Sequence, residues 1–515
     1  GSVTLRAGGI EGPAGISTAG GAVTLQATGG LSYGGAIRSG GGQVRLSSAT
    51  GGVFGADVVT GTGDIAVSAQ SGISGGSYQT SGIASFSSTA GSIALYDLQA
   101  GTAILQGAGS IEAVVGASNR VDATSTTSSV NLYNRSGEAL RLGTIRAASV
   151  GIYAGAGAVQ AAGGSITAST LALSAQGGTA GLGSASAPLL LRQRTPSGLG
   201  ITVSGGSSAL EAPVHLRLDD TSRLVNLDVQ GTVAGLQALR IGGGNVLDWS
   251  AGTPSAGAVD FSLIRLGSST AAFSGTLRFN VTNGGLRIGE LNLAGGGALN
   301  VNAAGSVVLG DITTSRAGAT GVQVVLNRCG FSTFCTLDSN ITVGRIDAGL
   351  GDVRLETYDN GHVRVTGSVS ARNLTVNAGG IYYDYSRYVS WPWNNYLQQR
   401  TTNTVELAQV NATGRVDIRH DGHGDITVGS LTNGGAVNIR AGGQYFAQIG
   451  PSTYAYLRTA NAITVSGTHA QRVTGDLEVR NSGIGDVAWS GNIDRNGQVY
   501  IDADDGSAVI GIDVD

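Results

Sequence analysis

Apolar and polar residues alternate in short runs along this chain, and the runs return at a nearly constant interval. The first run is Val3-Thr4-Leu5-Arg6-Ala7, in which alternate side chains fall on opposite faces of a strand. The leading apolar residue of the run recurs at Val3, Val23, Val44, Ile65, Ala84, Ala103, Val130, Val150 and Leu171, and only the step from Ala103 to Val130 is clearly longer than the others. A strand-like alternation at a fixed period of this size predicts a solenoid built of β-coils.

Each predicted coil is a short strand, a corner, a shorter strand and a second corner. Glycine pairs such as Gly8-Gly9 end the strands, because glycine adopts positive φ at little steric cost. Related runs continue through Val259-Asp260-Phe261 and Val437-Asn438-Ile439 to Val499-Tyr500-Ile501. We therefore expect an all-β fold in which residues 1–515 form one continuous parallel β-solenoid. At about 20 residues per coil it would hold roughly 25 coils and span about 120 Å.

The period stretches in four places, where we expect insertions that loop out of the coil. The long step from Ala103 to Val130 predicts a polar, solvated loop near 114–129, and an aliphatic run near 185–200 predicts an extra strand against the flank of the coil. The other two predicted insertions are near 327–338 and 381–400.

Both cysteines of the chain lie in the third insertion, at Cys329 and Cys335. Five intervening residues allow a looped disulfide, and two cysteines without a nearby histidine are too few ligands for zinc. A disulfide favours an oxidising compartment such as the cell surface or the extracellular space. The alternative is a pair of reduced cysteines on a cytosolic loop.

The fourth insertion is aromatic. Residues 381–396 contain seven of the 27 aromatic residues of the chain: Tyr382, Tyr383, Tyr385, Tyr388, Trp391, Trp393 and Tyr396. Tyrosine and tryptophan combine a flat apolar face with a polar edge, which suits sugar rings or a protein hot spot. These residues are our candidate ligand or contact surface. The alternative is that they pack on the flank of the coil or against Tyr445, Phe446, Tyr454 and Tyr456.

Composition and charge narrow the classes of partner. The net charge is -4, charged residues make up 12% of the chain, and lysine and methionine are absent. Nothing resembles the basic stripe that nucleic-acid binding requires, so we expect no nucleic-acid partner. No apolar run reaches the roughly 18 residues of a membrane span. The missing initiator and the start within a strand phrase suggest a segment of a larger protein.

The sequence offers weak candidates for catalysis or metal binding. Glycoside hydrolysis needs two carboxylates about 5–10 Å apart. The acids that come nearest to a pattern are Asp219, Asp220, Asp352, Glu356, Asp502, Asp504 and Asp505. None recurs at the coil period with a basic partner, so we expect no catalytic residues and no enzyme. His420-Asp421-Gly422-His423-Gly424-Asp425 allows a metal site, but it lies between strand phrases and fits a corner better. We expect no metal and no cofactor.

The assembled phrases resemble the filamentous-haemagglutinin-like exoproteins of Gram-negative bacteria, which are exported by two-partner secretion. The resemblance rests on strings such as Ser2-Val3-Thr4-Leu5-Arg6-Ala7-Gly8-Gly9-Ile10 and Leu171-Ala172-Leu173-Ser174-Ala175, and on the stretch from Gly181-Leu182-Gly183-Ser184 to Pro188-Leu189. It implies a right-handed parallel β-helix, an outer-membrane transporter as export partner, and a role in adhesion, aggregation or biofilm matrix.

We therefore expect a structural extracellular fibre or adhesin shaft at the cell surface. Its expected partners are a host or neighbouring-cell surface, glycans or matrix polysaccharide, and other copies of itself joined end to end or laterally. Two alternatives stay open: a polysaccharide-degrading β-helix enzyme, and a phage or contact-toxin stalk.

Overall fold

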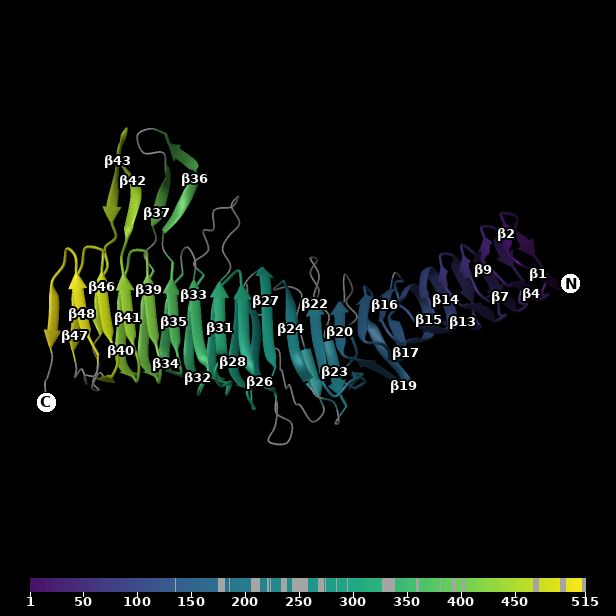
Figure 1. The fold of residues 1–515 in the computed structure, drawn as a ribbon, viewed down its shortest axis with the longest axis horizontal. Helices are drawn as coiled ribbons and strands as arrows, with labels where there is room; N and C mark the ends of the chain where they lie inside the picture. The colour runs from purple at the N-terminus through teal and green to yellow at the C-terminus, as the bar shows by residue number, and fades with distance from the viewer. Residues whose placement is uncertain are drawn as a thin grey trace. The chain divides into compact units, whose positions relative to one another are not determined.

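Parallel strands stacked in register dominate the computed structural model of the protein (Figure 1). The described strands make a parallel β-solenoid of about 19 turns with about 21 residues per turn, which confirms the predicted fold and period. The number of turns is below the expected 25, in part because two hairpins lie outside the coil. The structure describes residues 1–134, 136–174, 181–184, 186–204, 214–219, 222, 224–232, 239–242, 258–266, 273, 275–283, 285–293, 295–326, 339–357, 361–379, 381–390, 395–400, 403–465, 472–490 and 497–511.

Two units divide the chain, Gly1–Asp248 and Trp249–Asp515. The first coils of the first unit have three strands each, not the two predicted from sequence. The first ladder is β1 (Val3–Ala7), β4 (Val23–Ala27), β7 (Val44–Ser48), β10 (Ile65–Ala69) and β13 (Ile83–Ser88). The second is β2 (Ile10–Gly12), β5 (Leu31–Tyr33), β8 (Gly52–Phe54) and β11 (Gly72–Ser74). The third is β3 (Ile16–Ser17), β6 (Ala36–Arg38), β9 (Asp57–Gly61) and β12 (Ser77–Thr80).

Longer strands continue these ladders through the first unit. They are β14 (Ser92–Gly107), β15 (Ile111–Ser125), β16 (Ser129–Asn134), β17 (Leu140–Arg146), β18 (Ser149–Ala154), β19 (Ala158–Ala168), β20 (Thr170–Ser174), β21 (Leu189–Gln193), β22 (Leu199–Ser204), β23 (Val214–Leu218), β24 (Leu224–Thr232) and β25 (Leu239–Gly242). The predicted stack of the first six phrases is confirmed, since these residues are partners in register: Val3, Val23, Val44, Ile65, Ala84 and Ala103.

The long step from Ala103 to Val130 is not an insertion, so the loop predicted near 114–129 is wrong. Ala103 is in register with Val121, which comes well before Val130 in the chain and is fully buried in β15. Val130 instead continues the second ladder, in register with Ile111. The strands of both ladders show the same alternation of apolar and polar residues. The series of phrases traced in the sequence therefore changes from the first ladder at Ala103 to the second ladder at Val130.

The run near 185–200 also belongs to the coil. In β21, Leu191 is in register with Ile166 of β19, and both Leu189 and Leu191 are fully buried. The predicted extra strand against the flank is therefore wrong. These leucines face the interior, where they continue the aliphatic column of the coils before them.

Hydroxyl side chains close one corner of the early coils. The Thr60 hydroxyl donates to the carbonyl of Gly63, and Thr18 bonds Gly21 in the same way at 2.6 Å. The corner glycine cannot be replaced freely, because a Cβ on Gly63 would lie 2.3 Å from the carbonyl oxygen of Gly42. Neighbouring coils therefore approach each other closely at this corner.

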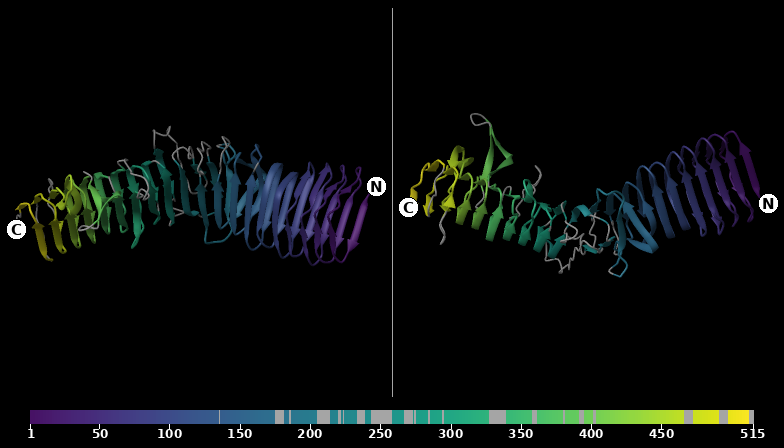
Figure 2. Two further views of the ribbon diagram at one scale, coloured as in Figure 1. Left: turned by 90° about the horizontal axis from the view of Figure 1, so that it is seen from above. Right: turned by 60° about the horizontal axis from the view of Figure 1, so that its bottom comes forward.

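The strands of the second unit lie side by side along the unit (Figure 2). They form two ladders in place of three. One of them, called ladder A, is β27 (Thr276–Asn283), β29 (Ala298–Ala303), β31 (Thr320–Leu326), β33 (Asp352–Thr357), β35 (Leu374–Ala378), β39 (Val416–His420), β41 (Val437–Ala441), β46 (Leu477–Asn481) and β48 (Val499–Ala503). Ladder B is β26 (Ala258–Leu266), β28 (Gly285–Leu293), β30 (Val307–Thr313), β32 (Ile341–Asp347), β34 (Val363–Ala371), β38 (Val405–Ala412), β40 (Ile426–Asn433), β44 (Ile463–Val465) with β45 (Arg472–Val473), β47 (Val487–Ser490) and β49 (Ala508–Gly511).

Extra residues in the second unit leave from the corner between a ladder A strand and the following ladder B strand. Leu286 and Val307 are partners one ordinary period apart, but the next partner of Val307 is Ile341, after a much longer step along the chain. The ladder keeps its register on either side of the segment between β31 and β32. The insertion predicted near 327–338 falls in that segment and lies outside the described residues. Among the described residues, no helix is long and apolar enough to cross a membrane.

Candidate functional site

Two β-hairpins stand on the coil of the second unit (Figure 1). Hairpin 1 is β36 (Ile381–Val389) paired antiparallel with β37 (Asn395–Arg400), and hairpin 2 is β42 (Gln444–Gly450) paired with β43 (Thr453–Arg458). Hairpin 1 forms the insertion predicted near 381–400. The sequence did not predict hairpin 2.

The hairpins leave the coil at the same corner, two coils apart. Hairpin 1 follows β35 and hairpin 2 follows β41, with the short corner after β39 between them. Coils and neighbouring strands both repeat at about 4.8 Å, so a two-stranded hairpin is as wide as two coils. Insertions at every second coil therefore leave room for hairpins side by side, which is the order β36, β37, β42, β43 in Figure 1.

Polar side chains join the two hairpins. The side-chain oxygen Oε1 of Gln398 in β37 accepts the backbone N–H of Phe446 in β42 at 2.9 Å. The guanidinium of Arg387 donates to the side-chain carbonyl of Gln448. The hairpins thus form one four-stranded feature, which we call the hairpin platform.

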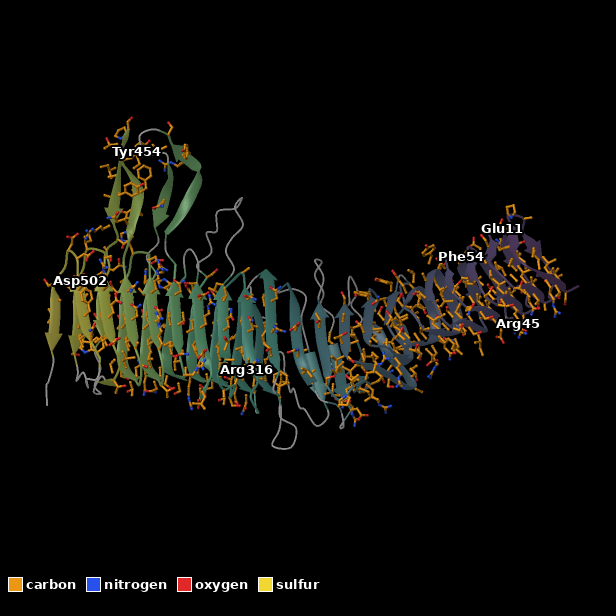
Figure 3. All side chains as sticks on the ribbon, in the orientation of Figure 1. Glu11, Arg45, Phe54, Arg316, Tyr454 and Asp502 are labelled. Carbon is orange, nitrogen blue, oxygen red and sulfur yellow. The ribbon has the colours of Figure 1, made fainter. Side chains whose placement is uncertain are left out.

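Aromatic rings fill the middle of hairpin 2. Phe446 is fully buried, with its ring centroid 5.9 Å from that of Tyr454 and 5.2 Å from that of Tyr456. Tyr445 is buried at the base of the hairpin, with its ring 5.4 Å from the His423 imidazole in an edge-on arrangement. Tyr454 lies on the raised part of the hairpin in Figure 3.

Three large apolar or aromatic side chains of the platform, here called its rim, are exposed to solvent. Tyr388 is 53% exposed, Ile449 is 55% exposed and Tyr456 is 51% exposed. Aromatic side chains that are half exposed keep a large apolar area available for contact with a partner. They are the described residues of the platform best placed to touch a partner.

Only part of the predicted aromatic surface can be placed. Tyr388 lies in β36 and is exposed, whereas the strands also contain the backbones of Tyr382, Tyr383, Tyr385 and Tyr396. The side chains of those four tyrosines, and both Trp391 and Trp393, lie outside the described residues. Their role as a ligand surface stays a prediction. Cys329 and Cys335 also lie outside the described residues, so the disulfide stays a prediction.

One asparagine just after the returning strand of each hairpin bonds the chain to the coil, an arrangement that we call the seat of the hairpin. The Asn403 amide donates to the carbonyl of Gly361 in the preceding coil at 3.0 Å, and also to the carbonyl of Gly379, directly after β35. After hairpin 2, the Asn461 amide donates to the carbonyl of Gly422 at 2.8 Å and to that of Gly424 at 2.6 Å. Both asparagines are buried, so these bonds satisfy carbonyls that water cannot reach.

The following coil completes each seat. His420 Nε2 bonds the carbonyl of Asn403, while its Nδ1 accepts the N–H of Gly422 at 2.9 Å. Asn481 repeats both bonds for hairpin 2: its amide donates to the carbonyl of Asn461 at 2.9 Å, and its Oδ1 accepts the N–H of Gly483 at 3.0 Å. His420 and Asn481 therefore do the same work at equivalent corners.

The equivalence of the two corners explains why histidines, aspartates and glycines cluster in residues 420–425, the candidate metal site of the sequence. His420-Asp421-Gly422-His423-Gly424-Asp425 recurs as Asn481-Ser482-Gly483-Ile484-Gly485-Asp486, without either histidine. Asp421 accepts a bond from Arg419 at 2.8 Å, and the second histidine accepts the N–H of Ala460 at 2.9 Å through Nδ1. Within the described part of the chain, no group of three or more potential metal ligands occurs.

A histidine of the preceding coil contacts the segment that follows each hairpin. Nδ1 of His362 accepts the N–H of Thr404 at 2.9 Å, and Nδ1 of His423 accepts the N–H of Ala460. Burial lowers the pKa of His420 below its ordinary value, against the opposing effect of its hydrogen bond to Asn403 and of the nearby acids. The sequence predicted a corner at residues 420–425. That the same hydrogen bonds recur beside both hairpins follows only from the register of the ladders.

The carboxylates considered for catalysis serve as ion-pair partners. Arg372 donates to both oxygens of Asp352 at 2.8 and 2.7 Å, and this bond lowers the pKa of Asp352. Glu356 is buried and paired with Arg354 at 2.8 Å. The remaining described acids of that set pair similarly: Asp219 with Arg192, Asp502 and Asp504 with Arg480, and Asp504 and Asp505 with Arg458. Asp220 lies outside the described residues.

No protein-family model matches the chain, and neither curated proteins nor solved structures include a match to it. The site must therefore be interpreted from its own geometry.

Proposed function

We propose that this protein is an extracellular β-solenoid shaft of a Gram-negative bacterium that displays the hairpin platform for contact with cell surfaces or matrix polysaccharide. One observation carries the proposal: two hairpins at alternate coils join into a platform with a buried centre and an exposed apolar rim. The ladders beneath bond every coil to its neighbours, so they can hold such a feature rigidly. The filamentous-haemagglutinin resemblance supports an adhesin and export through an outer-membrane transporter.

The exposed rim supports a role in contact. Tyr388, Ile449 and Tyr456 lie more than half exposed on strands that are anchored at their base by buried polar bonds. Interface hot spots favour tyrosine on a rigid support, because little side-chain entropy is lost when a partner covers it. End-to-end and lateral association of shafts remain part of the proposal.

Binding of the labelled chain to Gram-negative cells and to isolated matrix polysaccharides tests the proposal. The Tyr388→Ala/Tyr456→Ala variant should bind about tenfold more weakly, the usual loss for one hot-spot contact. Tyr96→Ala is the matched control, since Tyr96 is 67% exposed but lies on the first unit. Equal binding by all three proteins would refute the contact role of the platform. Release of reducing ends from the polysaccharides would instead support the enzyme alternative.

A further inference from the structure

Strand β43 forms one outer edge of the hairpin platform. Of the described strands, only β42 pairs with it, and hairpin 1 lies on the other side of β42 (Figure 1). We propose that β43 pairs antiparallel with β43 of a second copy of this chain about a two-fold axis, so that the two platforms join into one surface. The proposal rests on the contact role proposed above, and it names the surface through which two shafts associate laterally.

The backbone groups of β43 alternate between β42 and the open edge. Phe446 of β42 donates its N–H to the side chain of Gln398 in hairpin 1, so the backbone of Phe446 points away from β43. Tyr456 is the cross-strand partner of Phe446, and its backbone therefore points away from β42, toward the open edge. Backbone directions repeat at every second residue, so the groups of Tyr454 and Arg458 point the same way. An edge strand of this kind is a template for another strand.

The three outward positions of β43 are symmetric about Tyr456. In an antiparallel pair centred on this residue, Tyr456 meets Tyr456 of the second copy, and Tyr454 meets Arg458. Each is a hydrogen-bonded pair, because both residues direct their backbone groups at the partner strand. A two-fold interface uses the same patch on both copies and closes on itself, so it leaves neither β43 edge open.

The sequence of β43 lacks the features that keep an exposed edge strand unpaired. Charged residues, proline and bulges protect natural edges. Residues 453–457, Thr-Tyr-Ala-Tyr-Leu, contain neither a charge nor a proline, and the register irregularity of hairpin 2 lies beside its turn. The other outer strand, β36, contains Asp384 and Arg387, and its pairing with β37 is irregular between Asp384 and Tyr388. These differences favour β43, and not β36, as the edge that receives a second copy.

Pairing of the two edges enlarges the aromatic part of the platform. Cross-strand neighbours lie on the same face of a sheet, with Cα atoms about 5.5 Å apart in a hydrogen-bonded pair. The Tyr456 ring, which lies 5.2 Å from that of buried Phe446, is 51% exposed and comes to lie beside the Tyr456 ring of the second copy. The joined surface then has two tyrosines at its centre, and each copy supplies half of it.

The pairing also determines how the two shafts run. The hairpins are arranged side by side along the second unit, so a two-fold axis perpendicular to the plane of their strands reverses the direction of the shaft (Figure 1). Strands β42 and β43 are seven and six residues long, which is about 20 Å, and the two coils lie at opposite ends of the joined hairpins. Antiparallel pairing suits shafts that reach toward each other from two cells.

Cysteine trapping tests the pairing and its register. In a Cys329→Ser/Cys335→Ser background, Tyr456→Cys should form a disulfide-linked dimer under mild oxidation, because a Cα separation of about 5.5 Å is one that a disulfide spans. Tyr454→Cys alone should not, since it lies about 14 Å from Tyr454 of the second copy. The double variant Tyr454→Cys/Arg458→Cys should form the dimer again. Tyr96→Cys is the control for random collision, because Tyr96 is 67% exposed on the first unit.

A charge near the edge gives a second test in the otherwise natural chain. Ala455 of one copy lies diagonally across from Ala455 of the other, about 7–8 Å away. Ala455→Lys should therefore lower the association constant of the dimer at least about tenfold in sedimentation equilibrium, because like charges repel across an interface. Ala447→Lys is the matched control and should dimerise like the wild type. Ala447 is the cross-strand partner of Ala455 and is equally half-buried, but it lies on the inner strand.

Three results would overturn the pairing: a wild type that stays monomeric at its highest soluble concentration, equal trapping of Tyr456→Cys and Tyr96→Cys, or equal dimerisation of the two lysine variants. The contact role is measured separately. Ala455→Lys retains Tyr388 and Tyr456, so its binding to cells reports contact without the dimer. Trapping through Tyr454→Cys/Arg458→Cys reports the dimer whether or not the chain binds cells.

Discussion

Removal of the Asn461 side chain tests how hairpin 2 is seated. Its amide makes two bonds, to Gly422 at 2.8 Å and to Gly424 at 2.6 Å, and Asn461 is only 3% exposed. A buried hydrogen bond contributes about 0.5–1.5 kcal/mol, and a carbonyl left buried without a partner costs about 1–3 kcal/mol. Asn461→Ala should therefore lower the free energy of opening of hairpin 2 by about 2–5 kcal/mol.

The expected result is local. A loss of about 2 kcal/mol corresponds to about 30-fold faster exchange in hairpin 2, which hydrogen–deuterium exchange at pH 7.5 resolves. The coil should keep its melting temperature within a few degrees, because β41 and β46 pair directly beneath the hairpin. Asn411→Ala is the control, since Asn411 is only half-buried and its side chain contacts Gln409 at 3.5 Å. Hairpin 2 exchanging within twofold of the wild type would refute the role of the seat.

Two further predictions concern the coil. Leu46→Ala should lower the free energy of unfolding, measured with denaturant, by about 2–5 kcal/mol. Leu5 lies in the same interior column but is 45% exposed, so Leu5→Ala should lower it by less than about 1 kcal/mol. Equal losses would contradict the stacked core. Arg372→Gln should destabilise the protein at pH 6, because the hydrogen bond from Arg372 keeps the pKa of Asp352 low in the folded state. The difference in stability from the wild type should vanish as the pH falls below about 3.9, the pKa of an unfolded aspartate, and through the lower pKa of folded Asp352. A difference that persists in strong acid would contradict the pairing.

The ladders could be predicted from the sequence where successive apolar phrases all belong to the same face of the coil. Val3, Val23 and Val44 share a column because alternation and period agree. The same reasoning failed at Val130, which belongs to the other face, since the side-chain period of two is identical on both. A pattern of apolar residues cannot tell which face of a coil it lines.

The site was only half visible in the sequence. Aromatic density marked hairpin 1, whereas the four aromatics of hairpin 2, Tyr445, Phe446, Tyr454 and Tyr456, were considered only as packing partners for hairpin 1. The signal of hairpin 2 was the long step from Val437 to its partner Leu477, with Pro451 at the turn between two alternating runs. The joining of the hairpins depends on Gln398 reaching Phe446, a contact between segments far apart in the sequence that no local pattern specifies.

The most direct test of the contact role removes the platform from the coil. In the trimmed chain, residues 379–404 are replaced by the short corner 421–425, and residues 442–462 by the corner 482–486, so that both steps return to the normal period. Binding to Gram-negative cells is then measured beside circular dichroism and thermal unfolding. We expect an intact β-solenoid with its melting temperature within a few degrees of the wild type, and cell binding reduced to background. A trimmed chain that binds cells as tightly as the wild type would contradict it.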